Sequence, residues 1–217
     1  GCSLAESITA EDVRELRRQH PGVPVVTYVN TSAAVKAESD ICCTSGNAVR
    51  VIESLGVPEV IMIPDQFLAA NVARQTGVKV ITHPGACEVH ERFTPADNRQ
   101  IRADYAGEVT VLAHPECPPE VVDEADYAGS TAQMVSFVAE RRPKRVALIT
   151  ECSMSDNVAQ QYPDVEFVRP CNLCPHMKRN TLGAIRRALE TMTNEVTIDP
   201  AVAARARAAV DRMLEVR

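Results

Sequence analysis

A cysteine followed seven residues later by a threonine occurs three times in the 217-residue chain. The three pairs are Cys2 and Thr9, Cys87 and Thr94, and Cys174 and Thr181. A helical pattern follows each threonine, so the threonines are expected to cap helices at their N-termini. Capping and packing do not require the cysteines, which nevertheless recur at the same place. Three equivalent units around a common axis would bring the three thiols to one point, which predicts a metal or cluster site.

Three equivalent thiolates without a fourth fit a [4Fe–4S] cluster in which one iron keeps an open position. Such an iron could act as a Lewis acid on a hydroxyl or carboxylate group, as in a dehydratase. Zinc is the competing interpretation, because Cys171 and Cys174 form one half of a zinc motif. The sequence holds no second C-x-x-C or H-x₃-H pair at a suitable distance, so the spacing favours iron–sulfur.

The other thiols, and the histidines near the three cysteines, have structural alternatives. Four cysteines are interpreted as small buried hydrophobic residues: Cys42, Cys43, Cys117 and Cys152. Cys171 is either a redox partner of Cys174 or an alternative ligand. Three histidines, His83, His90 and His176, either support the metal site or lie on the surface. His114 and Glu116 are stronger candidates for chemistry, because two ionisable groups at one strand end seldom serve packing.

Short β-branched segments alternate with helical patterns, which predicts an α/β fold. Strands are expected at 23–30, 59–65, 79–84, 109–115, 145–151 and 165–170, and helices between them at 47–55, 68–75, 131–140 and 155–161. Near-continuous apolar strands separated by helices indicate short parallel sheets covered on both faces and joined by right-handed crossovers. The expected architecture is a set of repeated three-layer α/β/α units.

The order of elements repeats, and two copies correspond in detail. Thr44-Ser45-Gly46 matches Gly129-Ser130-Thr131, and Asn71-Val72-Ala73 matches Asn157-Val158-Ala159. We expect a second unit at 23–87 and a third at 88–174. The first unit is expected to be truncated to residues 1–22, with helices of 175–217 packing on it, and roughly 80 of its residues would precede Gly1. The apolar faces of the helices at 9–20 and 182–216 would then lack their packing surface; these faces hold Val13, Leu16, Leu182, Ile185 and Leu189.

Ligands of open parallel α/β sheets bind beyond the carboxyl ends of the strands. The polar residues and cysteines expected there are Tyr28, Asn30, Thr31, Asp65, His83, Cys87, His114, Glu116, Glu151, Cys171 and Cys174. Ser45 and the pair Ser130-Thr131 are expected at helix N-termini, where backbone N–H groups favour an anion. Two such positions aimed at one cavity would suit a dianionic substrate.

Composition excludes several classes of function. The net charge of −6 and the lack of a basic stripe with aromatic residues argue against nucleic-acid binding. No apolar segment is long enough to span a membrane, and no signal peptide is recognisable. Eight cysteines in a chain of regular strands and helices indicate a reducing cytoplasm with some thiols committed to metal, rather than a secreted disulfide scaffold.

Six segments carry a family resemblance: YVNTSAAVKAESDICCTSGNAV (28–49), HPGACEVH (83–90), HPEC (114–117), DYAGSTAQM (126–134), TEC (150–152) and CPHMKRNTL (174–182). Together they resemble the quinolinate synthases of NAD biosynthesis. The resemblance implies three homologous α/β domains around a pseudo-threefold axis, one of them truncated here. Each domain would give one cysteine to a [4Fe–4S] cluster. The implied reaction condenses iminoaspartate with dihydroxyacetone phosphate to quinolinate, with loss of phosphate and two waters.

The resemblance also implies roles for individual residues. The cluster ligands would be Cys2, Cys87 and Cys174. The substrate-binding residues would be Tyr28, Val29, Asn30, Ser45, His114, Pro115, Glu116, Ser130 and Thr131. Glu116 would be the general base, with Tyr28 and His114 as further catalytic groups. Expected partners are the two substrates, a functional link to L-aspartate oxidase, and a second copy in a homodimer, without nucleic acid or membrane.

Two other classes of protein compete with this enzyme. A non-catalytic iron–sulfur scaffold, or a redox-sensing α/β protein, would bind the cluster without turning over substrate. A zinc-bound structural module would be colourless. Turnover with both substrates separates the enzyme from the scaffold, and the visible spectrum separates both from the zinc protein.

Overall fold

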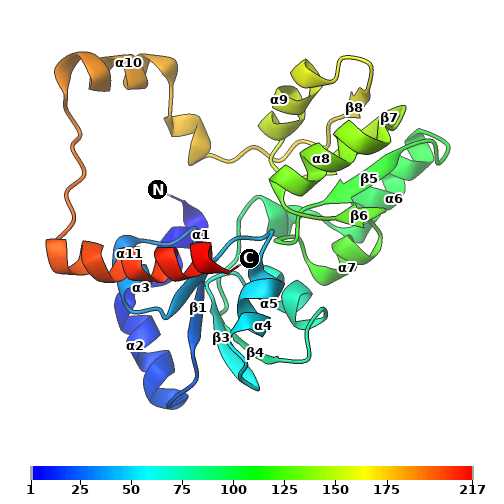
Figure 1. Ribbon diagram of the computed structural model, residues 1–217. Helices are drawn as coiled ribbons and strands as arrows, with labels where there is room; N and C mark the ends of the chain where they lie inside the picture. Colours follow the sequence, from blue (N-terminus) through cyan, green and yellow to red (C-terminus); the bar gives the residue numbers. More distant parts are fainter. Residues whose placement is uncertain (1, 217) are drawn as a thin grey trace.

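The computed structural model describes residues 2–216, which form two α/β units (Figure 1). The strands are β1 (Val25–Tyr28), β2 (Ile41–Cys43), β3 (Glu59–Ile63), β4 (Lys79–Thr82), β5 (Thr110–Ala113), β6 (Tyr127–Ala128), β7 (Arg145–Ile149) and β8 (Glu166–Val168). The helices are α1 (Ser3–Glu6), α2 (Ala10–Gln19), α3 (Ala33–Ala37), α4 (Ala48–Ser54), α5 (Gln66–Ala73), α6 (Pro95–Asp104), α7 (Pro119–Asp123), α8 (Thr131–Arg141), α9 (Ser153–Gln161), α10 (Leu182–Thr191) and α11 (Pro200–Glu215), with 3₁₀ turns η1 (His90–Arg92) and η2 (Met177–Arg179). Within the described residues, no helix is both long enough and apolar enough to cross a membrane.

Each unit contains one four-stranded parallel sheet. The strand order is β2-β1-β3-β4 in the first sheet and β6-β5-β7-β8 in the second, so the two sheets have the same topology. Helices pack on the faces of both sheets, as parallel strands buried on two sides require. The predicted α/β class and the predicted repeat of parallel units are confirmed.

The edge strands β2 and β6 were not expected from the sequence, because segments of three and two residues show no periodicity. In both units an aspartate just before the edge strand holds the neighbouring strand. Asp40 Oδ2 accepts a hydrogen bond from the Val25 N–H (2.7 Å), and Asp126 Oδ2 accepts one from the Val111 N–H (2.7 Å). The repeat therefore extends to individual hydrogen bonds.

All three threonines of the cysteine repeat cap helices, as predicted. Thr9 and Thr94 each form a capping box with the aspartate three residues later. Thr181 accepts a hydrogen bond from the Ala184 N–H (3.1 Å). The helices that follow are α2, α6 and α10, so the three copies share one local structure.

The structure corrects the assignment of residues 1–22 to a first unit. Helix α2 packs on the first sheet of the structure, where Val13 is fully buried against Val25 and Ile61. Leu16, which was also expected to lack a packing surface, lies partly buried on the same face. A stripe of apolar residues predicts that a helix face is covered, but it does not say which sheet covers it.

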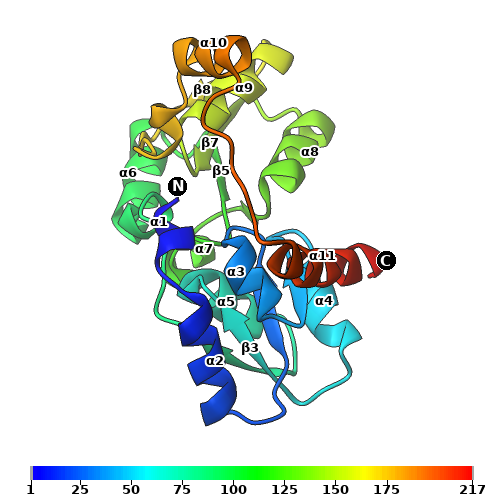
Figure 2. The same ribbon diagram turned by 90° about the vertical axis from the view of Figure 1, so that its left-hand side faces the viewer.

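Helix α11 differs from expectation in the same way. It was expected to pack on the first unit, yet it lies across α3 and β2 of the unit at 23–87 (Figure 2). Ala206, Ala209 and Met213 form its buried face, and Ala209 and Met213 join the core that contains β1 and β3. The C-terminal helix thus completes the layer over the edge of the first sheet.

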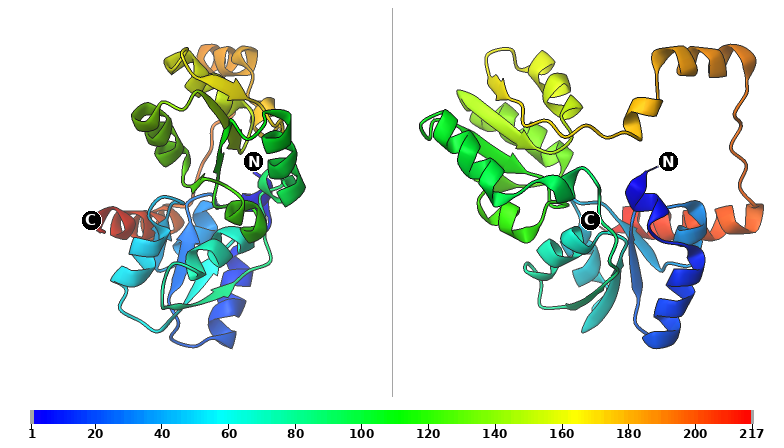
Figure 3. Two further views of the ribbon diagram at one scale, coloured as in Figure 1. Left: turned by 90° about the vertical axis from the view of Figure 1, so that its right-hand side faces the viewer. Right: turned by 180° about the vertical axis from the view of Figure 1, so that it is seen from behind.

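Helix α10 differs from α2 and α11, because it does not pack on the first sheet. It stands away from the two sheets and is joined to α11 by an extended segment (Figures 1 and 3). None of its residues is buried, and Leu182 and Leu189 are 86% and 72% exposed. The expected exposure of this apolar face is therefore confirmed, whereas that of α2 is not.

Candidate functional site

A cavity of about 500 Å³ lies at the carboxyl ends of the two sheets. Nine of the residues to which the family resemblance assigned a role in cluster binding, substrate binding or catalysis line it: Cys2, Tyr28, Asn30, Ser45, Cys87, His114, Glu116, Thr131 and Cys174. They come from both units and from the segment before α2. Tyr28 is the last residue of β1, and Asn30, Ser45, His114 and Glu116 lie within three residues of a strand end. The strand-end rule for parallel sheets thus predicted where this cavity lies.

Three further residues predicted to bind substrate do not line this cavity. The main chain of Val29 donates to the Cys43 carbonyl (2.9 Å), and Ser130 caps α8 by accepting from the Gln133 N–H (3.3 Å). The Pro115 carbonyl accepts a hydrogen bond from Asn71 Nδ2 (2.8 Å). In this structure all three hold neighbouring main chain in place, and their contact with substrate stays a prediction.

Two of the three predicted ligand cysteines are anchored by carboxylates at equivalent positions. Asp65 follows β3, and its Oδ2 accepts from the Cys87 N–H (3.3 Å). Glu151 follows β7, and its Oε1 accepts from the Cys174 N–H (3.3 Å). Asp65 and Glu151 were expected at strand ends, but their role as supports of the cysteines was not foreseen.

The three predicted ligand cysteines are free thiols in partly buried positions. Burial and the nearby charge of Glu116 raise the pKa of Cys87 to about 12. A thiolate at this position therefore needs a cation beside it, because metal binding displaces the thiol proton. Cys87 also forms a compact group with His90 and Glu116, in which one donor atom of each lies within 4.8 Å of the others.

The remaining cysteines divide into two kinds. Cys42, Cys43 and Cys117 are fully buried free thiols, as predicted. Cys152 was interpreted as another buried hydrophobic residue, but it forms a disulfide with Cys171 across a Cα–Cα distance of 5.0 Å. Cys171 is therefore paired with Cys152 and not with Cys174, which leaves Cys174 free.

A carboxylate between two imidazoles occupies the wall of the cavity formed by the second unit. Glu116 Oε2 lies 3.0 Å from His90 Nδ1 and 3.2 Å from His114 Nδ1, and the two rings stack with centroids 4.7 Å apart. Burial alone would raise the pKa of Glu116, but the adjacent imidazoles lower it well below its usual range. Burial lowers the pKa of His114. The group can thus present an ionised carboxylate beside a neutral His114 at neutral pH.

The first unit places a phenol opposite this carboxylate. Burial, and then the charge of Glu116, raise the pKa of Tyr28 well above its usual value, so the phenol keeps its proton at neutral pH. Ser45 Oγ lies 3.2 Å from His114 Nε2 and links the two units. A proton acceptor and a proton donor therefore face one cavity from different units.

The loop that carries Asn30 is held by a lysine that the sequence analysis did not single out. Lys36 Nζ donates to the Val29 carbonyl (2.7 Å) and also contacts Thr31 through its carbonyl and hydroxyl oxygens. The ammonium group is therefore used for loop structure and not for binding an anion. A lysine six residues beyond a strand-end asparagine carries no sequence signal for this role.

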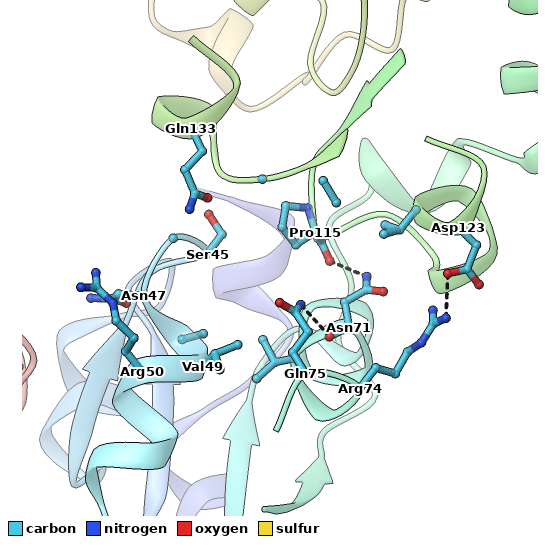
Figure 4. Close-up of a pocket in the computed structure, with 16 residues that line it drawn as sticks. Ser45, Asn47, Val49, Arg50, Asn71, Arg74, Gln75, Pro115, Asp123 and Gln133 are labelled. Carbon is cyan, nitrogen blue, oxygen red and sulfur yellow. Dashed lines mark hydrogen bonds and ion pairs between the residues drawn. The ribbon is translucent and has the colours of Figure 1, made fainter. Parts of the chain in front are cut away.

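A second cavity of about 480 Å³ lies on the other side of Ser45 and Pro115, between α4, α5 and α8 (Figure 4). Across it Arg74 forms an ion pair with Asp123 (2.7 Å), and the Asn71 amide reaches the Pro115 and Cys117 carbonyls (2.8 and 2.9 Å). These contacts join the two units directly behind the strand-end loops.

Comparison with known proteins shows the family to which this chain belongs. The family described as quinolinate synthetase A protein matches the chain over residues 1–215. The chain belongs to the quinolinate synthetase A family. Similar members are quinolinate synthase 2 of Mesorhizobium japonicum, with 68% identity over 216 residues, and the quinolinate synthases of Agrobacterium fabrum (67% over 216 residues) and Xylella fastidiosa (64% over 216 residues).

The alignments with these quinolinate synthases cover the whole of this chain but only part of each relative. The covered share is 66% of the Mesorhizobium protein, 62% of the Agrobacterium protein and 63% of the Xylella protein. The chain thus spans a little under two thirds of the length of these members of the family.

Proposed function

We propose that this chain forms the catalytic cavity of a quinolinate synthase. The reaction would join iminoaspartate to dihydroxyacetone phosphate, giving quinolinate, phosphate and two waters, as a step of NAD biosynthesis in the cytoplasm. The observation that carries the proposal is the convergence of Cys2, Cys87 and Cys174 on one cavity, together with the carboxylate of Glu116 and the phenol of Tyr28.

The donor set fits a [4Fe–4S] cluster. Cys2, Cys87 and Cys174 are free, partly buried and come from equivalent repeats, and the cavity between them is also lined by apolar Leu4 and Val89. When bound, the cluster would supply a Lewis-acidic iron to the hydroxyl and carboxylate groups of the substrates. None of the described residues that line the cavity is a lysine or arginine, so the open iron of the cluster would bind the carboxylate groups of the substrates there.

The protein's own groups divide the proton transfers of this reaction. Glu116 is ionised and would accept a proton from carbon, while Tyr28 keeps its proton and would donate it to a departing hydroxyl. Asn30, Ser45 and Thr131 line the same cavity and would orient carboxylate or phosphate oxygens by hydrogen bonds. The pairing of an ionised carboxylate with a protonated phenol suits ring formation by successive loss of water.

Cluster binding can be tested by anaerobic reconstitution with iron and sulfide. We expect a broad brown absorbance, and its loss in Cys2→Ala, Cys87→Ala and Cys174→Ala. Cys42→Ala is the matched control, because Cys42 is fully buried in the core of the first unit and does not line the cavity. A colourless protein that binds one zinc ion, or full iron content in Cys87→Ala, would overturn the cluster assignment.

Catalysis is tested by incubating the reconstituted protein with both substrates and measuring quinolinate. The assay should include the chain itself and a version extended to the length of the relatives. Quinolinate formation that requires Glu116 supports the proposal. A stable cluster without turnover in either version would favour the alternative, a non-catalytic iron–sulfur scaffold or redox sensor.

A further inference from the structure

A carboxylate and an imidazole join the segment that follows Cys87 to the segment that follows Cys174. Glu88 Oε1 lies 3.2 Å from His176 Nε2, and the two side chains are 23% and 13% exposed. We propose that Glu88 and His176 are positioning residues, which tie the two segments together and hold Cys87 and Cys174 in place for one shared cluster. This inference rests on the cluster binding proposed above. From the sequence His176 was either a support of the metal site or a surface residue, and Glu88 had no assigned role.

The two carboxylate oxygens of Glu88 have different surroundings. Oε2 lies 3.5 Å from Nη2 of Arg92, a side chain that is half exposed, whereas Oε1 is buried beside His176. The Nε2–H direction departs from ideal alignment on Oε1, but Oε1 has no other hydrogen-bond partner among the described residues. A carboxylate oxygen buried without a partner loses hydration that nothing replaces, which is costly. The contact with His176 therefore compensates the burial of this oxygen.

Two further contacts bring the other ligand segments to the same turn. The Glu88 backbone N–H donates to Ser3 Oγ (3.5 Å), which joins it to the segment of the first predicted ligand. Asn172 Nδ2, in the segment of the third predicted ligand, donates to the Val89 carbonyl (3.4 Å). Of these three contacts between ligand segments, the carboxylate–imidazole pair is the shortest and the one that involves two ionisable groups.

The pair connects cysteines that are anchored on different sheets. Asp65, after β3 of the first sheet, accepts the Cys87 N–H, and Glu151, after β7 of the second sheet, accepts the Cys174 N–H. Each anchor fixes one cysteine to its own unit and leaves the spacing between the two thiols unset. A contact between the two segments supplies that constraint, as outer contacts commonly do for metal ligands.

The internal repeat shows that the local fold does not require this imidazole. The position two residues after the repeated cysteine is Leu4 in the first copy, Val89 in the second and His176 in the third, and all three line the strand-end cavity. Leu4 and Val89 are 0% and 2% exposed, as expected for packing residues. A polar ring occurs in the third copy alone, and a carboxylate directly after the cysteine occurs in the second copy alone. The two complementary groups are thus placed where these copies meet.

The tie between the segments is tested without iron, by hydrogen exchange of the full chain under anaerobic conditions. In both Glu88→Ala and His176→Leu we expect the amides of 88–93 and of 174–180 to exchange several-fold faster, because removing either partner frees both segments. Exchange in β1 and β5 should not change. His176→Leu gives the third copy the residue type of the first, and Glu91→Ala is the matched control for an exposed carboxylate on η1. Faster exchange in the mutated segment alone, or no change in either segment, would overturn the proposal.

The second test uses the reconstituted protein and measures the rate of iron loss to a chelator. Glu88→Ala and His176→Leu should each raise this rate about tenfold, within the range for groups that orient metal ligands. The double variant should lose iron no faster than either single variant, because both changes remove one contact. Glu88→Gln keeps an acceptor and His176→Gln keeps a donor, so each should recover part of the retention.

Two results of the second test would contradict the proposal. Unchanged iron loss in both single variants would show that the pair does not position the cysteines. A double variant in which the two single effects multiply would show that Glu88 and His176 act independently. If the wild type binds no cluster, the proposed function fails, while hydrogen exchange still decides whether the pair ties the two segments together.

Discussion

The two α/β units share a frame and differ in the chemistry placed at its strand ends. β1 and β5 are equivalent. Tyr28 ends β1 and Asn30 follows it, whereas His114 and Glu116 follow β5. The edge-strand aspartates and the carboxylates that hold Cys87 and Cys174 are also shared. The repeated frame thus brings two sets of side chains to one cavity. Divergence then supplies a phenol and an amide from one unit and an imidazole–carboxylate pair from the other.

The largest effect expected from this comparison is at Glu116. Glu116→Gln keeps the shape of the side chain but removes the charge that would accept a proton. We expect kcat for quinolinate formation to fall at least about 100-fold with the iron content unchanged. The matched change is Asn30→Ala at the equivalent position of the first unit, which should act mainly on KM. A rate in Glu116→Gln close to that of the wild type would make the carboxylate structural and remove the proposed division of labour.

A smaller effect is expected at the carboxylates that the two units have in common. Asp65→Ala and Glu151→Ala each remove the acceptor of a ligand cysteine N–H and should weaken retention of the cluster by about 10- to 100-fold. The measurement is the rate of iron loss to a chelator under anaerobic conditions. Glu166→Ala, at an exposed position on β8, is the control. If only one of the two variants lost iron faster, the two anchors would not be equivalent.

The sequence predicted most of this frame. The longer apolar strands were located to within a few residues, because alternation of strands and helices is a strong pattern. The edge strands β2 and β6 were missed because segments of three and two residues show no periodicity. The sequence did not predict that helices α2 and α11 pack on the first sheet, since an amphipathic pattern identifies a buried face but not its partner.

The residues of the candidate site were predicted from the topology of the parallel sheets more than from sequence motifs. Tyr28, His114 and Glu116 could be proposed because parallel strands gather their carboxyl ends at one edge. Thr150, which also lines this cavity, could not be proposed, because its contact with His90 joins residues 60 positions apart. The pairing of Cys152 with Cys171 was missed for the same reason, since the sequence does not reveal which strand-end loops are neighbours.

The strand-end loops of the two units are held by different means, which gives a third prediction. In the first unit Lys36 ties down the loop that carries Asn30, whereas the second unit uses Pro115 and the Asn71 amide. Lys36→Met should loosen the first loop and raise KM up to about tenfold while kcat falls less, because Asn30 would bind substrate less well. Lys79→Met is the control, since the Lys79 side chain is 74% exposed. A fall in kcat alone would place the effect of Lys36 on the chemistry and not on binding.

The smallest expected effect tests the contrast between the helices that follow the repeated threonines. On α6, Ile101 is buried in the core of the second unit, whereas Ile185 on α10 is half exposed. Ile185→Ala should change the free energy of unfolding by less than about 0.5 kcal/mol, as for other surface substitutions. Ile101→Ala is the matched control and should cost about 2–4 kcal/mol, because it removes buried methyl groups and leaves a cavity. Urea unfolding of both variants measures the difference. A loss above 1 kcal/mol in Ile185→Ala would mean that α10 packs against another surface in solution, and the apolar face of this helix would then have a partner that the two sheets do not provide.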